Sequence, residues 1–451
     1  MNKPRRTDQI KLIAFMQAQN CTNYAGSWRH PETMTDVLTP AYYQRIARTL
    51  EEGKFHLAFF DDRLAMPDIY GSDYRAAVEF GIRPVKLDLI PILTAMGLVT
   101  QKLGLGATYS TTYTHPFHFA RSFATLDLMI GGRAAWNVVT SINDSEAENF
   151  GLDEHLEHDI RYDRAEEFID VVNGLWHSWD DDALVVDKAT SRYADPTKVK
   201  ALNHEGKWFK CKGPLTVPRS PQGDPIIIQA GQSGKGQHFA AKWANLVFVM
   251  YKDIAAGAKQ YDAFKKIVEE HGRSASDMVV APAIYTIVAP TREEALQKKA
   301  LIEAQALPQD TLVLLSEILN FDFGTRGLNE PLTDEDLASI SAPVWVERVV
   351  KASGSPNPTP QDFITHTGRG TINDAPVFCG SPSDVADEME AWFYGGACDG
   401  FVLAATHSPG AYEDFVRLVV PELQRRGSFQ KDYLGETLWD NLGRPARGGR
   451  S

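Results

Sequence analysis

Polar side chains stand at the carboxyl end of a segment that has the character of a buried β-strand. The segment 133–141 (RAAWNVVTS) carries a Trp and a Val pair, which strands favour, and it is apolar on both faces, as a covered parallel strand must be. Asn137 lies inside it and Ser141 ends it. In barrels and doubly wound sheets this end of a strand carries the chemistry. The alternative is a buried strand with one hydrogen-bonded Asn.

A glycine-rich stretch, 231–236 (GQSGKG), follows a second buried strand and opens a helix. Backbone N–H groups at a helix start, together with the Ser233 hydroxyl and the Lys235 charge, predict an anion site. The alternative is a simple turn between strand and helix. A P-loop is excluded because the spacing differs and no Ser or Thr follows the Lys.

Two histidines, His155 and His158, have the i, i+3 spacing of one helix face and could be interpreted as a metal pair. The sequence offers no further ligands at a matching spacing and no His-Glu-x-x-His pattern. We therefore predict no metal, and we favour a histidine and Tyr162 as donors to a phosphate.

The adjacent carboxylates Asp61 and Asp62 end another predicted strand. Neighbouring strand residues point to opposite faces, so only one of the two can face a barrel mouth. A glycosidase with paired carboxylates is therefore not supported.

Strand-like and helical segments alternate along the chain. Strands are expected over 11–17, 55–61, 103–110, 133–141, 225–230, 244–250, 278–289 and 400–405, and helices over 42–52, 91–101, 118–129, 162–178, 235–243, 254–271, 292–306, 383–394 and 412–426. Eight such units predict an α/β fold, a (β/α)8 TIM barrel with insertions. A doubly wound sheet is the alternative, but it usually shows a glycine-rich turn after its first strand. We expect one domain over 1–451, with excursions at 180–224 and 307–374 and a polar tail at 427–451.

The amino-acid composition narrows the class of protein and the kinds of partner further. The 451 residues are 43% hydrophobic and 23% charged, which is ordinary for a globular protein. A formal net charge of −13 disfavours nucleic acid and anionic membranes as partners. The four cysteines have neither zinc-ligand nor redox spacing, which is typical of reduced thiols in a cytoplasm. The basic N-terminus lacks a signal-peptide core, and the most apolar run, 89–100, is too short to span a bilayer.

Several long blocks together carry a resemblance to a known family. They are GSWRHPE (26–32), EEGKFHLAFFDD (51–62), ATYSTTYTHP (107–116), ARSFATLDLMIGGRAAWNVVTS (120–141), NFGLDEHLEHDIRYDRAEEF (149–168), RSPQGDPIIIQAGQS (219–233) and DGFVLAATHSPGAYEDFVRLVVPELQRRG (399–427). The sequence resembles the bacterial-luciferase-like flavin monooxygenases, in the branch of the nitrilotriacetate and dibenzothiophene-sulfone monooxygenases. The resemblance implies a TIM barrel that uses reduced FMN and O2, with the FMN supplied by a separate NADH:flavin reductase. It also implies a homodimer or homotetramer.

The resemblance also assigns site residues. Family flavin contacts fall on Asp62, Thr108, His158, Tyr162 and Ser233, and we add Asn137, Ser141 and Gln232 as expected cofactor-binding residues. Thr108 and Asn137, on neighbouring strands, are the expected catalytic pair, because a hydroxyl and an amide stabilise developing charge without titrating. Trp28, Phe60 and Phe248 are expected to wall an apolar substrate pocket, although each could equally be a core residue.

The expected substrate is a small apolar compound, aromatic or organosulfur, such as a sulfone that undergoes C–S cleavage. Residues 22–25 (TNYA) stand where the sulfone and alkane enzymes of this branch carry histidines, and a second family histidine is replaced within 315–323. These departures leave an aminopolycarboxylate, an alkane or a haloaromatic as alternative substrates. A flavin-binding barrel without catalysis is the competing class.

Overall fold

Eight parallel strands close into a barrel in the computed structural model, which describes residues 8–141, 143–231, 234–367 and 375–444. Around the barrel the strands run β1 (Lys11–Gln17), β2 (Leu57–Asp61), β3 (Gly104–Ser110), β4 (Ala134–Val139), β9 (Ile226–Gln229), β10 (Leu246–Val249), β11 (Val279–Val288) and β13 (Gly400–Ala404). The β13 strand pairs back onto β1, so the barrel has no open edge. The predicted (β/α)8 fold is confirmed.

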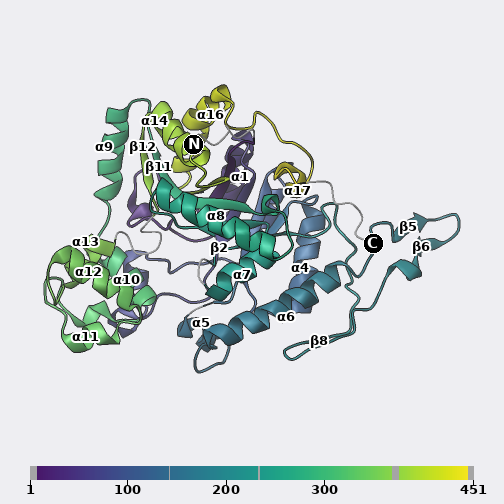
Figure 1. Ribbon diagram of the computed structural model, residues 1–451, viewed down its shortest axis with the longest axis horizontal. Coiled ribbons are helices and arrows are strands. Elements are labelled where there is room, and N and C mark those ends of the chain that lie inside the picture. The colour runs from purple at the N-terminus through teal and green to yellow at the C-terminus, as the bar shows by residue number, and fades with distance from the viewer. Residues whose placement is uncertain (1–7, 142, 232–233, 368–374, 445–451) are drawn as a thin grey trace.

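Helices surround the barrel on its outer side (Figure 1). They are α1 (Pro40–Glu52), α3 (Leu89–Gly97), α4 (Pro116–Met129), α6 (His158–Trp176), α7 (Gly234–Trp243), α8 (Ile254–Glu270), α9 (Arg292–Glu303), α14 (Pro382–Tyr394) and the run of α15 (Gly410–Asp414), η6 (Phe415–Val419) and α16 (Val420–Arg426). The core has two layers, because strand side chains alternate in direction. Trp136 packs in the layer beneath the helices, whereas Phe15 and Phe59 pack inside the barrel.

A ninth strand, β12 (Val377–Gly380), was not predicted. It pairs in parallel with Tyr285–Val288, the carboxyl end of β11. Its four residues, VFCG, give too short a pattern to distinguish a strand from a loop.

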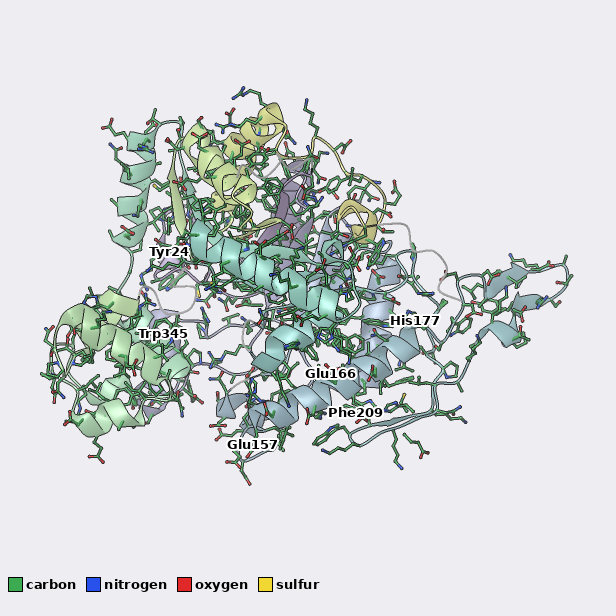
Figure 2. All side chains as sticks on the ribbon, viewed as in Figure 1. Tyr24, Glu157, Glu166, His177, Phe209 and Trp345 are labelled. Atoms are coloured by element: carbon green, nitrogen blue, oxygen red, sulfur yellow. The ribbon has the colours of Figure 1, made fainter. Side chains whose placement is uncertain are left out.

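Both excursions contain regular structure. The first holds two small hairpins, β5 (Leu184–Asp187) with β6 (Arg192–Ala194) and β7 (His204–Glu205) with β8 (Lys210–Cys211), and the β5–β6 hairpin projects from the body (Figure 1). The second forms a helical group of α10 (Pro308–Leu319), α11 (Asp334–Ser339), α12 (Pro343–Ser353) and α13 (Pro360–Thr367). This group has its own apolar cluster and lies beside the barrel (Figure 1). Trp345, labelled in Figure 2, is part of α12 and marks the group there. Two short helices, α2 (Arg75–Phe80) and α5 (Asp144–Asn149), complete the loops after β2 and β4.

The C-terminal segment is more than a polar tail. Its helix α17 (Leu438–Asn441) buries Leu438, which packs with Leu442 against the interior side chains of the barrel. Leu438 lies so close to the first residue of β3 that a Cβ on Gly104 would be 2.6 Å from Leu438 Cδ1. The segment therefore closes the amino-terminal end of the barrel, opposite the expected site. No helix of the described residues is long and apolar enough to cross a membrane.

Candidate functional site

Thr108 and Asn137 lie side by side at the carboxyl ends of β3 and β4. They pair in register, and Asn137 Nδ2 donates a hydrogen bond to Thr108 Oγ1 at 2.8 Å. The Thr108 hydroxyl donates in turn to the Phe60 carbonyl at 2.7 Å. The remaining atom, Asn137 Oδ1, is buried and accepts no hydrogen bond from any described residue. A buried acceptor without a donor is rare in folded proteins, so this amide oxygen is suited to receive one from a ligand.

The two carboxylates at the end of β2 have different partners. Asp61 Oδ1 lies 3.2 Å from Lys86 Nζ, and Asp61 Oδ2 accepts from Asn23 Nδ2 at 3.4 Å. Asp62 Oδ1 instead accepts the Arg63 N–H at 2.8 Å. Burial raises the pKa of Asp62 to about 7, although the nearby Lys86 charge opposes the shift. Asp62 can therefore hold or release a proton near neutral pH, whereas Asp61 belongs to an ion pair.

Ser141 holds an unusual backbone conformation directly after β4. Its φ of 57° lies in the left-handed region, which non-glycine residues rarely adopt. Its hydroxyl donates to Ser110 Oγ at 3.0 Å, and its carbonyl accepts from the Arg161 guanidinium of α6. Such conformations cluster at functional sites, where the surrounding contacts hold them.

Tyr162 and His158 lie one turn apart at the start of α6, which begins directly after Glu157, labelled in Figure 2. Their ring centroids are 5.0 Å apart. The half-buried Tyr162 hydroxyl lies against the start of α7, where a Cβ on Gly236 would be only 2.7 Å from it. Glycine at position 236 therefore lets the hydroxyl approach the backbone that the sequence predicts to bind an anion.

Lys235, at the start of α7, is ion-paired, and its expected contribution to an anion site stays a prediction. Its Nζ lies 3.1 Å from Asp163 Oδ1 and 3.7 Å from Asp159 Oδ2, so two carboxylates already match its charge. Gln232 and Ser233 lie outside the described residues, and their expected roles stay predictions.

The three expected substrate-wall residues lie in different places. Phe248 is partly exposed and packs with Phe15 and Phe59 inside the barrel, at ring-centroid distances of 5.4 and 6.2 Å. The prediction for Phe60 is wrong, because its fully buried ring faces the helices and lies 6.2 Å from Tyr43 of α1. Strand alternation places its neighbour Phe59 inside the barrel instead.

Trp28 belongs to η1 (Ser27–Arg29), in the loop that follows β1. Its half-buried indole N–H donates to the Phe80 carbonyl at the end of α2, at 2.8 Å. This bond fixes the indole against α2 and leaves its expected role at the substrate as a prediction.

Ion pairs between distant segments were missed by sequence reasoning. Arg63, which follows β2, lies 2.6 Å through Nη2 from Oε2 of the buried Glu317 on α10. Arg29 pairs with Asp310 at the start of the same helix. The partners are 254 and 281 positions apart, so no local pattern reveals them.

One group among the described residues has the composition of a metal site: His30, Glu32 and His407, whose ligand atoms lie within 4.8 Å of one another. His30 Nδ1 accepts the Glu32 backbone N–H at 3.1 Å, so its neutral ring carries the proton on Nε2, the atom that would have to bind the metal. Lys298 Nζ also lies 3.8 Å from Glu32 Oε2. This geometry does not favour a metal, and the predicted absence of one stays a prediction.

The described residues fit a flavin mononucleotide. The unpaired Asn137 Oδ1 can accept from a ring N–H, and the Tyr162 hydroxyl beside the start of α7 can donate to a phosphate. Ser110, which ends β3, and Ser141, which follows β4, add two hydroxyls at this end of the barrel. Active sites of barrel enzymes lie at the carboxyl ends of the strands, which is where these polar groups stand.

Comparison with known proteins agrees with this class. The model of the luciferase-like monooxygenase family matches residues 18–400. The chain is 42% identical over 438 residues to the dibenzothiophene-sulfone monooxygenase of Rhodococcus erythropolis, with 96% of each chain covered. It is 38% identical to the N-acetyl-S-(2-succino)cysteine monooxygenase of Bacillus subtilis, again with 96% of each covered. A crystal structure of a riboflavin lyase with modified FMN and riboflavin superposes with a TM-score of 0.85 at 31% identity, covering 97% of this chain and 96% of that one. The chain belongs to the luciferase-like monooxygenase family. Its class is that of the FMNH2-dependent monooxygenases.

Proposed function

We propose that this protein is the oxygenase of a two-component system that attacks a small apolar organosulfur compound and cleaves a carbon–sulfur bond. Reduced FMN arrives by diffusion from a separate NADH:flavin reductase. For a sulfone, the net reaction consumes O2 and four electrons, two from reduced FMN and a further two from NADH, and releases FMN and NAD⁺. It replaces the C–S bond by a C–O bond, giving a hydroxyl compound and a sulfinate, while the second oxygen atom leaves as water.

The buried pair of Thr108 and Asn137 carries the proposal. FMN, when bound, supplies two electrons and activates O2. Asn137 Oδ1 is the free acceptor at this position, and the bond from Asn137 Nδ2 to Thr108 fixes its direction. A fixed acceptor of this kind can orient a ligand N–H without having to reorganise. Asp62, whose pKa burial raises to about 7, can hold a proton after the end of β2.

The barrel interior supports an apolar substrate. Phe15, Phe59 and Phe248 form one aromatic cluster, which excludes water. The cations Arg29, Arg63 and Lys86 in the loops that follow β1 and β2 each pair with a carboxylate, at Asp310, Glu317 and Asp61 respectively. They are therefore not poised for a polycarboxylate. The Rhodococcus relative is named for a sulfone and the Bacillus relative for a thioether that carries three carboxyl groups, so the two names share the sulfur atom and not the apolar character.

The test is turnover by the purified chain with FMN, NADH and a flavin reductase. The panel is dibenzothiophene sulfone, nitrilotriacetate, a long alkane and a haloaromatic, with products identified by mass under 18O2. We expect one labelled oxygen in the hydroxyl product of the sulfone. Consumption of only the carboxylate or the alkane would overturn the sulfur assignment and leave the monooxygenase function in place.

Two controls separate the competing class and the cofactor. FAD in place of FMN should not support turnover, and chemically reduced FMN should replace the reductase. Flavin binding without oxygen transfer to any panel member, under conditions in which a known oxygenase turns over, would favour a non-catalytic flavin-binding barrel. We further propose a homodimer or homotetramer, which light scattering on the purified chain tests directly.

A further inference from the structure

Arg161, in the first turn of α6, has one edge of its guanidinium without a partner. The residue is buried, with 9% of its surface exposed. Its Nη1 donates to the Ser141 carbonyl and, at 3.4 Å, to Thr140 Oγ1. Its Nε is buried and makes no hydrogen bond, and Nη2 makes none to any described residue. No carboxylate of the described chain lies within ion-pair distance of this guanidinium.

Two other buried arginines differ from this arrangement. Arg444 also has an unpaired Nε, but both of its Nη atoms donate, to the Ser276 and Asn245 carbonyls. Arg133 also lacks an ion pair among the described residues, but all three of its nitrogens donate to oxygen atoms, at Ile130, Thr100, Leu103 and Gly97. Arg164, one turn along α6, donates to the Thr111 carbonyl and stacks 4.7 Å from the Phe209 ring. Arg161 keeps its Nε–Nη2 edge unused, and a buried charge left in this way is costly unless an anion meets it.

The unused edge has the shape for an oxyanion. A guanidinium stays charged in proteins and offers two parallel N–H groups that match a carboxylate or phosphate. Burial lowers the pKa of Arg161, and Tyr162, Tyr113 and Glu146 oppose this shift, Glu146 from beyond ion-pair distance. Glu146 Oε1 already accepts the Leu64 N–H at 3.1 Å.

The position of Arg161 indicates which anion it meets. It is adjacent to Tyr162 and three residues after His158, both expected flavin contacts, and it holds the carbonyl of Ser141. It thereby links the segment that follows β4, the strand of Asn137, to the start of α6.

We propose that Arg161 is an additional flavin-binding residue, whose Nε–Nη2 edge binds an anionic oxygen of FMN. This proposal rests on the proposed function, because it requires FMN at the carboxyl ends of β2–β4. The oxyanion has two sources, the phosphate or the negatively charged pyrimidine ring of reduced flavin, and the experiment below distinguishes them.

The test measures dissociation constants of oxidised FMN, riboflavin and anaerobically reduced FMN for the full chain. Arg161→Gln should weaken binding by about 10- to 100-fold, the effect of losing one charge-assisted hydrogen-bonded pair. If Arg161 binds the phosphate, FMN is weakened in both redox states and riboflavin is not. If it binds the ring, only reduced flavins are weakened. Arg121→Gln, an exposed arginine on α4, controls for the lost charge and should change nothing.

Arg161→Lys is the second variant, for use if Arg161→Gln does not fold. It keeps the positive charge but lacks the two parallel N–H donors of the guanidinium. We expect it to fold and to recover part of the affinity, with a steeper loss as salt is added. Wild-type affinity for both redox states in a folded Arg161→Gln or Arg161→Lys chain would overturn the proposal. Failure of the wild-type chain itself to bind FMN would instead overturn the proposed function, and this inference with it.

Discussion

Glu317 on α10 is bound to Arg63 through a 2.6 Å contact between Oε2 and Nη2, across 254 positions of sequence. The other oxygen, Oε1, accepts the backbone N–H groups of Asp68 and Ile69 at 3.0 Å each. One buried carboxylate therefore fastens the helical insertion to the loop that follows β2, next to Asp62.

Glu317→Ala should destabilise the chain by about 3–5 kcal/mol, because it leaves a guanidinium and two backbone donors unpaired. Urea unfolding followed by circular dichroism measures this. Glu347→Ala, at an exposed position of α12, is the matched control and should change stability by less than about 0.5 kcal/mol. Equal stability of the two variants would contradict the role assigned to Glu317.

Asn137→Ala should lower kcat by about 100- to 1,000-fold, the loss seen when one preorganised polar group is removed from a charge-stabilising site. Thr108→Val removes the acceptor that orients Asn137, so the double variant should lose little more than the worse single one. Steady-state rates with saturating reduced FMN measure both. Strictly additive losses would show that the two residues act independently.

Asp62 should make stability depend on pH in an uncommon direction for a carboxyl group. Its folded pKa of about 7 lies above its ordinary value of 3.8, so between these limits the folded state binds more protons than the unfolded state. Stability then falls as pH rises from about 4 to 7, and is flat above that range. Asp62→Asn should therefore raise the Tm at pH 8 and have little effect at pH 4. An equal Tm shift at both pH values would show that Asp62 is not buried as an acid.

Tyr162→Phe should weaken FMN binding by about 1–3 kcal/mol, because a hydrogen bond to a charged group is lost. Ser233→Ala should have a similar effect, and the affinity of the wild-type chain should be on the order of micromolar, as a diffusing co-substrate requires. Flavin fluorescence titration gives these constants. Lys235→Ala is the control, since Asp159 and Asp163 already match its charge. A larger loss of FMN affinity in Lys235→Ala than in Tyr162→Phe would show that the phosphate binds near Lys235 and not at the Tyr162 hydroxyl.

Phe248→Ala and Phe60→Ala should separate substrate contact from core packing. Each variant removes one phenyl ring from a barrel strand, Phe248 from β10 and Phe60 from β2, but only Phe248 is partly exposed inside the barrel. We expect Phe248→Ala to raise KM for an apolar substrate several-fold with modest loss of stability. Phe60→Ala should leave the KM of the folded fraction unchanged and destabilise by about 3–5 kcal/mol. The reverse pattern would place the substrate outside the barrel.

The order of strands and helices and one pair of the candidate site could be predicted from the amino-acid sequence. Each barrel strand and each surrounding helix lies where the hydrophobic period placed it, because period and turn residues are local properties of the chain. The pairing of Thr108 with Asn137 also followed, since parallel strands that are neighbours in sequence are neighbours in a barrel. The alternation rule separated Asp61 from Asp62 in advance.

Other features were decided only by the tertiary structure. The alternation of side chains along β2 shows that Phe59 and Phe60 face opposite sides, but not which of them faces the barrel interior. The tertiary structure places the Phe60 ring outside, under the helices, and the Phe59 ring inside. The carboxylates on Lys235, the partner of Glu317 and the unused edge of Arg161 depend on which side chains meet across helices and loops. Sequence determines which groups can carry charge or donate protons, whereas burial and partner geometry, which set their energies, exist only once distant segments have packed together.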